Sequence, residues 1–174
     1  MLFENQQIEI HELPSTEDLD FQKLDARYLT IKIINHLVFF VVVMLAVGFF
    51  LLLENDFSWT PTLMIFMSVW GLIYVGTLLY MRKEFLLRGY VLRKHDIVYR
   101  KGWLWTSIVV VPFNRIQHCE LSQGPLEKSY KLAKLNIFTA GGQSSDLKLP
   151  GLKKEEAASI KEFLLNQINE HNYA

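Results

Sequence analysis

Cysteine is almost absent from this chain of 174 residues, which holds only Cys119. A single cysteine excludes an internal disulfide and a zinc site built from several cysteines. The five histidines are scattered, and none lies three or four residues from another histidine or from Cys119. Phosphate-binding glycine loops and dinucleotide fingerprints are also missing. We therefore expect no metal site, no cofactor and no catalysis.

The chain also has no net charge, because eighteen basic residues balance eighteen acidic ones. The charges are unevenly distributed. Residues 1–25 hold seven acids and one base, whereas residues 82–134 hold eleven bases and four acids. Residues 37–53 and 57–81 hold no charged residue at all. Two such apolar runs exclude an ordinary soluble domain as a description of the whole chain.

The two uncharged runs predict a pair of transmembrane helices at about 33–53 and 62–81. Each offers about 20 residues, which at a rise of 1.5 Å per residue cross the roughly 30 Å hydrocarbon core. A pair of buried soluble helices is the alternative, but neither run has the polar face that such helices carry. We expect an acidic arm at 1–30, a transmembrane hairpin at 31–83 and a further domain at 84–174.

Charges at the ends of the spans predict the orientation of the hairpin. The short loop carries Glu54 and Asp56 without a base, whereas basic residues flank the other ends, namely Arg27, Lys32, Arg82 and Lys83. By the positive-inside rule, both termini lie in the cytoplasm and the spans lie in the inner, cytoplasmic membrane. A cleaved signal peptide is not expected, because the first run is too long and follows a mostly acidic segment.

A few polar and small residues interrupt the spans. His36 could belong to an ion path, but we expect it in the first helical turn, within reach of headgroup water. Small residues allow helices to approach closely. We expect them to pack within the hairpin or against another membrane protein; they are Gly48, Ser68, Gly71 and Gly76.

After Lys83 the pattern changes to short apolar or alternating segments separated by turn residues. These segments predict six or seven strands of a small antiparallel sheet. From 153 to 169, apolar residues recur every three or four positions and predict one amphipathic helix; they are Ala157, Ile160, Phe163 or Leu164, and Ile168. The predicted fold class is therefore α+β, with a bent sheet or open barrel that a C-terminal helix covers.

The order of several short motifs in this second half carries a family resemblance. They are Arg100 with Gly102, a strand ending in Pro112, Arg115-Ile116-Gln117, Gln123-Gly124-Pro125-Leu126, Leu132-Ala133, Thr139-Ala140-Gly141 and Leu149-Pro150-Gly151. Residues 85–170 thereby resemble the bacterial pleckstrin-homology-like domains of small two-span membrane proteins. One departure is Lys131, where such sequences commonly have Gly. The resemblance implies a PH-type β-barrel without established catalysis, and self-association or association with larger PH-like membrane proteins.

The basic block that follows the spans is the feature of the sequence that suggests a function. Its candidate lipid-facing residues are Arg82, Lys83, Arg88, Arg93, Lys94, Arg100 and Lys101. Lys and Arg near an anionic leaflet each contribute about 1 kcal/mol. The alternative is that Arg82 and Lys83 only set topology and that the other residues of the block are solvated strand residues. We expect the last four residues of the block to form one surface on the sheet. The acidic arm could pack against this surface.

Three further side chains have alternative interpretations. Trp103 and Trp105 are two apart and would share one strand face, where they either enter the membrane interface or fill the core. Cys119 next to His118 could suggest a nucleophile, but the two point to opposite faces of a strand. We expect Cys119 to be buried and inert.

These observations favour a non-enzymatic membrane protein whose cytoplasmic PH-like domain serves as an assembly module or faces anionic lipid headgroups. The alternative is an accessory subunit of a transport or envelope-stress complex that acts through its hairpin. The expected partners are the membrane and either a second copy or a larger PH-like membrane protein. Nucleic acid is not an expected partner, because no nucleic-acid-binding motif accompanies the basic block.

Overall fold

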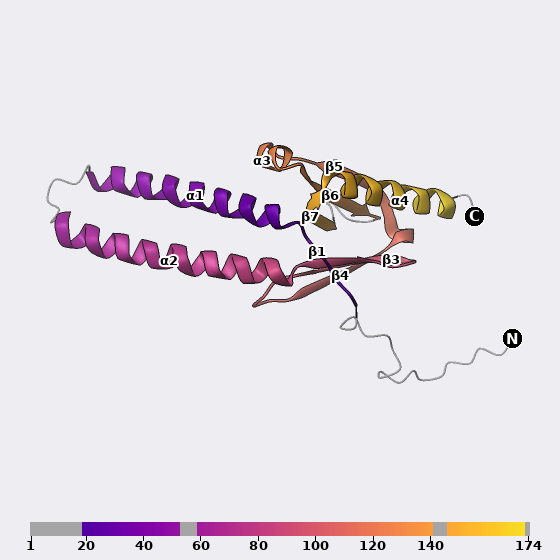
Figure 1. The fold of residues 1–174 in the computed structure, drawn as a ribbon, viewed down its shortest axis with the longest axis horizontal. Coiled ribbons are helices and arrows are strands. Elements are labelled where there is room, and N and C mark those ends of the chain that lie inside the picture. Colours follow the sequence, from indigo (N-terminus) through magenta and orange to yellow (C-terminus); the bar gives the residue numbers. More distant parts are fainter. Residues whose placement is uncertain (1–18, 53–58, 141–145, 173–174) are drawn as a thin grey trace, which may run out of the picture.

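The fold is a long helical hairpin that projects from a small β-rich domain (Figure 1). We describe it from a computed structural model that covers residues 19–52, 59–140 and 146–172. Glu54 and Asp56, most of the acidic arm and Gly141 of the Thr139-Ala140-Gly141 motif lie outside the described residues. Two helices, seven strands in two antiparallel sheets and a C-terminal helix confirm the predicted α+β class.

The hairpin consists of α1 (Ala26–Leu52) and α2 (Trp59–Leu87). Within them, Ala26–Phe50 and Leu63–Leu87 are long and apolar enough to cross a membrane, and only 6% and 0% of these segments are buried in the protein. Both helices extend further toward the domain than the expected bounds of 33 and 81. The additional turns carry charged residues, and they pack on the domain through Tyr28 and Phe85.

Aromatic and polar side chains hold the two helices together. The ring of Phe40 lies 4.9 Å from that of Trp70 and 5.2 Å from that of Tyr74. His36 Nε2 lies 2.9 Å from Thr77 Oγ1, which makes a hydrogen bond between the helices. His36 therefore lies in the third turn of α1, and the expectation of a first-turn position was wrong because α1 begins at Ala26.

The predicted small residues do not mediate this helix pair. A Cβ added to each of the three glycines would meet no heavy atom within 4 Å among the residues that the structure describes, own-helix backbone aside; they are Gly48, Gly71 and Gly76. Ser68 donates its hydroxyl to the carbonyl of Met64 in its own helix, at 2.8 Å. Packing between α1 and α2 in their apolar part thus depends on large rings and the His36–Thr77 pair.

The strands form a four-stranded and a three-stranded sheet, both antiparallel. The first sheet, in the order β1-β2-β3-β4, contains β1 (Gln22–Lys23), β2 (Gly89–Leu92), β3 (Asp96–Lys101) and β4 (Ser107–Pro112). The second contains β5 (Ile116–Ser122), β6 (Leu132–Thr139) and β7 (Leu147–Lys153). The short helix α3 (Pro125–Ser129) joins β5 to β6, and α4 (Lys154–Asn172) follows β7.

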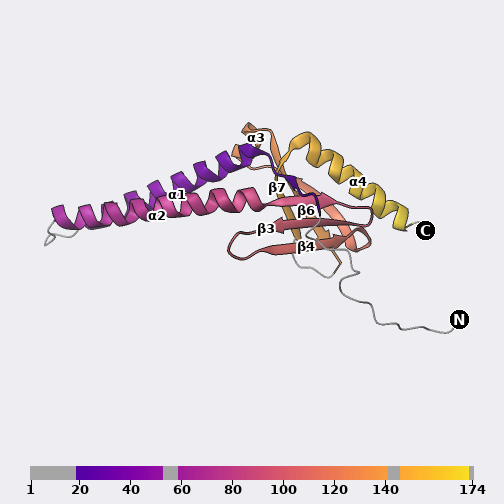
Figure 2. The same ribbon diagram turned by 60° about the horizontal axis from the view of Figure 1, so that its bottom comes forward.

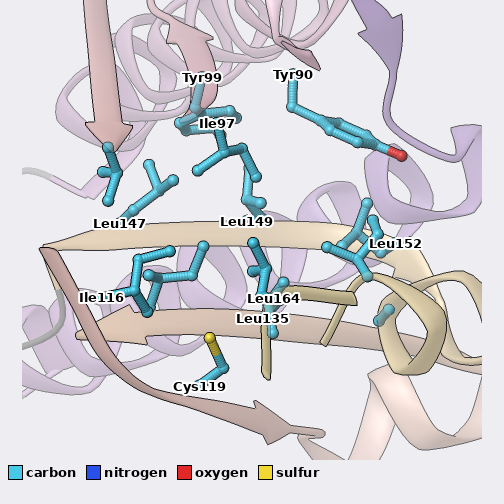
Figure 3. Packing of buried hydrophobic residues seen from close by; sticks show 14 of the residues in the cluster. Tyr90, Ile97, Tyr99, Ile116, Cys119, Leu135, Leu147, Leu149, Leu152 and Leu164 are labelled. Atoms are coloured by element: carbon cyan, nitrogen blue, oxygen red, sulfur yellow. The ribbon is translucent and has the colours of Figure 1, made fainter. Parts of the chain in front are cut away.

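The core lies between the two sheets and α4 (Figure 3). Ile97 and Tyr99 from the first sheet point toward Leu149 from the second, and all three are at most 2% exposed. The predicted face of α4 points into the core with Ala157, Ile160 and Leu164, whereas Phe163 remains 42% exposed. The periodicity therefore identified the helix and its buried face, with Leu164 rather than Phe163 in the core.

The segment before α1 belongs to the first sheet, although the sequence suggested an arm. Gln22 pairs with Tyr90 and Lys23 with Gly89, so β1 covers the edge of β2. Leu24 is buried in the core. Residues 1–18 of the acidic arm lie outside the described residues, so its packing on the basic residues stays a prediction. Within the described part, the guanidinium of Arg100 lies 4.1 Å from the centre of the Phe21 ring.

Lys131 adopts the left-handed conformation, with φ of 56°. Its amide donates to the carbonyl of Lys128, and its own carbonyl accepts from Lys154 at 3.1 Å. The turn that commonly carries Gly in the resembling family is thus formed here by a residue with a side chain, at a conformational cost of about 1 kcal/mol.

Candidate functional site

The candidate site lies where the helices meet the domain, and it begins with a very short link. α2 ends at Leu87 and β2 starts at Gly89, so only Arg88 separates helix from strand. Phe85 in the last turn of α2 is part of the domain core. With one linking residue and a buried anchor, the domain has a fixed direction relative to α2.

A cluster of charged side chains joins both helices at this level. Lys32 Nζ donates to Glu84 Oε2 at 2.8 Å, and Arg88 Nε donates to Glu84 Oε1 at 3.0 Å. The three side chains are 21%, 13% and 16% exposed. Glu84 is the shared acceptor, so it connects α1, α2 and the start of the sheet.

The start of α1 is attached to the opposite sheet. The amide of Asp25 donates to the carbonyl of Gly151 in β7, at 3.0 Å. Asp25 also caps the helix, because its Oδ1 accepts from the amide of Arg27 at 2.9 Å. The hydrogen bond from the Arg27 side chain lowers the pKa of Asp25 from 3.8 to about 2. Both helices are therefore attached to the domain, one to each sheet.

The turn between β3 and β4 lies beside α2. Figure 2 shows this hairpin turned back along the last part of the helix. The Trp103 ring lies 5.8 Å from that of Tyr80, and Lys83 Nζ lies 4.6 Å from the Trp103 ring centre. Gly102 has φ of +95°, and a Cβ there would lie 2.0 Å from the carbonyl oxygen of Trp105. The tight turn therefore requires glycine.

The prediction that Trp103 and Trp105 share a strand face was wrong. Both lie in the loop between β3 and β4, since β3 ends at Lys101 and β4 begins only at Ser107. They are 38% and 83% exposed, which also excludes the core position that we considered for them. The apolar residues of this segment resemble the pattern of a strand. The turn at Gly102 instead places Trp103 and Trp105 in a loop, where they are exposed to solvent.

The structure separates the predicted basic surface into two groups. Lys101 and Arg100 lie at the α2 end of β3, with Arg82 and Lys83 nearby on the last turns of α2. Arg93 and Lys94 lie in the turn at the opposite end of β3, about 20 Å away by the rise of an extended strand. The expectation of a single surface from all four strand residues was wrong, because turns at the two ends of one strand point in opposite directions.

Several of these cations already have partners. Arg93 pairs with Asp96, Arg88 with Glu84, and Arg100 Nε donates to the carbonyl of Leu87 at 3.3 Å. The side chains of Arg82, Lys83, Lys94 and Lys101 are exposed. Among the seven predicted basic residues, the exposed ones near the α2 end of the domain are therefore Arg82, Lys83 and Lys101, which we call the junction cations.

A basic groove of about 450 Å³ lies next to the junction, and the sequence analysis missed it. Its cationic lining comes from the α2–β2 link and from the three strands β3, β6 and β7: Arg88, Lys101, Lys134 and Lys148. Tyr28, Tyr99 and one carboxylate, Asp146, complete the polar lining. The groove forms between residues far apart in sequence, so no local motif could indicate it. Its charge suits an anionic group such as a phosphate.

His118 and Cys119, the neighbours that could suggest a nucleophile, differ in their exposure on β5. Cys119 is 7% exposed, and burial raises the pKa of its thiol to about 11, which confirms the predicted burial. His118 points outward and stacks on Phe138, with 4.2 Å between ring centres. Within residues 19–52, 59–140 and 146–172, no group of three or more His, Cys, Asp or Glu side chains could hold a metal ion.

Comparison with known families assigns this architecture to one of them. Residues 37–168, about three quarters of the chain, match the Bacterial PH domain family. The chain belongs to this family. The match begins within α1 and includes the rest of the helical hairpin together with β2 to β7. In this member of the family, two apolar helices are joined to a PH-like domain.

A curated relative supports the same assignment. The chain is 37% identical over 75 residues to the UPF0699 transmembrane protein YdbS of Bacillus subtilis (strain 168). The similar stretch covers 43% of this chain and 45% of that protein, less than half of either. No solved structure matches the chain. Together with the two apolar helices, these similarities identify a membrane protein with a bacterial PH domain.

Proposed function

We propose that this protein is a non-enzymatic protein of the inner, cytoplasmic membrane whose PH-like domain faces the anionic lipid headgroups of the cytoplasmic leaflet. The observation that carries the proposal is the position of the junction cations at the α2 end of the domain, where headgroups meet the spans. Exposed Lys and Arg at that level attract anionic lipid by about 1 kcal/mol each.

The orientation in this proposal follows from the charges that flank the spans. Arg27, Lys32, Arg82 and Lys83 all lie on the domain side of the hairpin. The only charged residues in the loop at the other end are acidic, Glu54 and Asp56. The positive-inside rule then places the domain and both termini in the cytoplasm.

The short link through Arg88 supports a lipid-facing role. A domain on a flexible tether would spend little time near the leaflet, whereas this one is held by Phe85 and by the Glu84 cluster. The basic groove beside the junction cations offers a second place for an anionic headgroup. Both features favour contact with lipid over a role in the open cytoplasm.

The test is the composition of lipids that remain bound to the full chain. The protein is extracted from bilayers of phosphatidylcholine and phosphatidylglycerol in polymer-bounded nanodiscs, and the retained lipids are quantified. We expect phosphatidylglycerol to be enriched, and the enrichment to fall in the triple variant Arg82→Gln, Lys83→Gln, Lys101→Gln. High salt should weaken it similarly, because exposed charges are screened within about 8 Å at physiological ionic strength.

The matched control uses the basic residues at the far end of the sheet. Arg93→Gln with Lys94→Gln removes two charges from the same domain, but at the end that points away from the spans. This variant should retain the enrichment. Equal loss in both variants, or retained lipid identical to the bulk composition, would contradict the proposal.

A second candidate function is that of an accessory subunit in a transport or envelope-stress complex, with the hairpin as the binding surface. The open space beside the three glycines of α1 and α2 favours it, together with an apolar groove of about 210 Å³ along the hairpin that includes Gly71 and Trp70. The partner would be a second copy or a larger PH-like membrane protein. Replacement of Gly71 or Gly76 by Leu should then abolish cross-linking to that partner, whereas Val69→Leu at an exposed position should not.

A further inference from the structure

The tip of the β3–β4 hairpin presents an unusual group of large apolar side chains to solvent. The exposed fractions are 38% for Trp103, 61% for Leu104 and 83% for Trp105. Contiguous exposed apolar side chains mark surfaces that bind a partner or a membrane. The position of the tip decides between these two.

The tip lies at the level where the apolar part of α2 ends. Trp103 contacts the ring of Tyr80, and Lys83 Nζ lies over the indole of Trp103. The uncharged run of the sequence ends at Met81, between these two contacts. In a protein that crosses the bilayer with α2, this is the boundary between hydrocarbon and headgroups, where Trp and Tyr are enriched.

The tip also has the shape of a fixed membrane anchor. Gly102, with φ of +95°, reverses the chain so closely that its Cα approaches the carbonyl of Trp105. Lys83 and Lys101 flank the aromatic residues, and long basic side chains reach from apolar surroundings to lipid phosphates. Because the backbone is held by the β3–β4 pairing from Lys101 and Ser107 onward, little order has to be gained on insertion.

We propose that Trp103, Leu104 and Trp105 insert into the cytoplasmic interfacial layer of the same bilayer that α1 and α2 span. The hairpin tip then forms a third attachment of the domain to the membrane, besides the two helices. The inference rests on the proposed function for the leaflet that faces the domain. It differs from that proposal in its driving force, which is burial of apolar surface rather than attraction of charge.

The experiment measures the depth of Trp105 in the full chain. Trp59, Trp70 and Trp103 are replaced by Phe, which keeps the aromatic contact of position 70 with Phe40 and leaves Trp105 as the single indole. The protein is placed in bilayers that contain brominated phosphatidylcholine, a quencher confined to the acyl region. We expect Trp105 to lose most of its fluorescence there and to be protected from acrylamide, a quencher in water.

The matched control places the indole in the other turn of β3. Lys94→Trp, combined with Trp105→Phe in the same background, gives an exposed indole at the end of the sheet that points away from the spans. It should be quenched by acrylamide and not by brominated lipid. A second measurement keeps all tryptophans: Leu104→Cys and Lys94→Cys, each in Cys119→Ser, carry an environment-sensitive dye, and only position 104 should shift to the blue in bilayers.

The outcomes separate this inference from the lipid-charge proposal. Quenching of Trp105 by brominated lipid in wholly neutral bilayers supports insertion, whatever the phosphatidylglycerol enrichment shows. Quenching by acrylamide at both positions overturns insertion, while retained enrichment would leave the lipid-charge proposal intact. Protection of Trp105 from both quenchers also overturns it and indicates a protein contact, such as a second copy.

Discussion

Replacement of Glu84 by Gln should test whether the charged cluster fixes the helices to the domain. The substitution keeps the shape of the side chain but removes the charge that Lys32 and Arg88 share. Loss of one member of a buried ion pair costs about 3–5 kcal/mol, because the remaining charge is left uncompensated. The cluster is partly exposed, at 13–21% of its side-chain surface, so we expect a smaller loss of about 2 kcal/mol.

The assay is the midpoint of thermal unfolding of the full chain in one detergent. For a chain of this size, about 2 kcal/mol lowers the midpoint by about 4–8 °C. Glu120→Gln, at an exposed carboxylate on β5, is the control and should leave the midpoint unchanged.

A double-mutant cycle decides whether the effect comes from the pair. Lys32→Met added to Glu84→Gln removes the cation that the first substitution leaves without its acceptor. The double variant should recover part of the lost stability, with a coupling of about 1 kcal/mol or more. Unchanged midpoints in Glu84→Gln, or strictly additive losses in the double variant, would refute the reasoning.

Three further predictions concern single residues. Lys131→Gly should raise the unfolding midpoint by about 1–2 °C, because relief of the left-handed strain is partly offset by the greater freedom of glycine in the unfolded chain; a lower midpoint would contradict this. Asp25→Ala should cost about 1 kcal/mol of unfolding free energy at neutral pH through loss of the cap. Because the pKa of Asp25 falls from 3.8 to about 2 on folding, its charge stabilises above pH about 4, and this contribution should disappear as the pH falls toward 2, which a pH series of midpoints checks. Cys119, with its pKa raised to about 11 by burial, should resist maleimide at pH 8 until the protein unfolds; rapid labelling of the folded chain would show that its burial is wrong.

The elements that sequence predicted well are those whose signal is local. The spacing of Ala157, Ile160 and Leu164 sufficed for α4, since a helix repeats its buried face every three or four residues. The six segments after Lys83 became β2 to β7 for the same reason, because alternation and turn residues lie within each segment. The two long apolar runs likewise identified α1 and α2 without information from elsewhere in the chain.

The features that sequence missed depend on contacts between distant segments. β1 has only two residues, and it is recognisable as a strand only through its pairing with Gly89 and Tyr90, which follow the helical hairpin in sequence. The basic groove assembles from α1, the link at Arg88 and both sheets, so its lysines are scattered in sequence. The separation of Arg93 from Lys101 is different: it follows from the length of β3 and could have been predicted once the two turns were placed.

The pairing of β1 with β2 has a consequence for biosynthesis. β1 leaves the ribosome before either span, and its partner strand follows after both, so the transmembrane hairpin is an insertion within the folded sheet. Gln22 can reach Tyr90 only if the chain returns to the side on which it began, after an even number of crossings. A nascent chain that fails to insert one span cannot close the first sheet, and it leaves the edge of β2 open. The first sheet can therefore be completed only after both helices between β1 and β2 have inserted correctly.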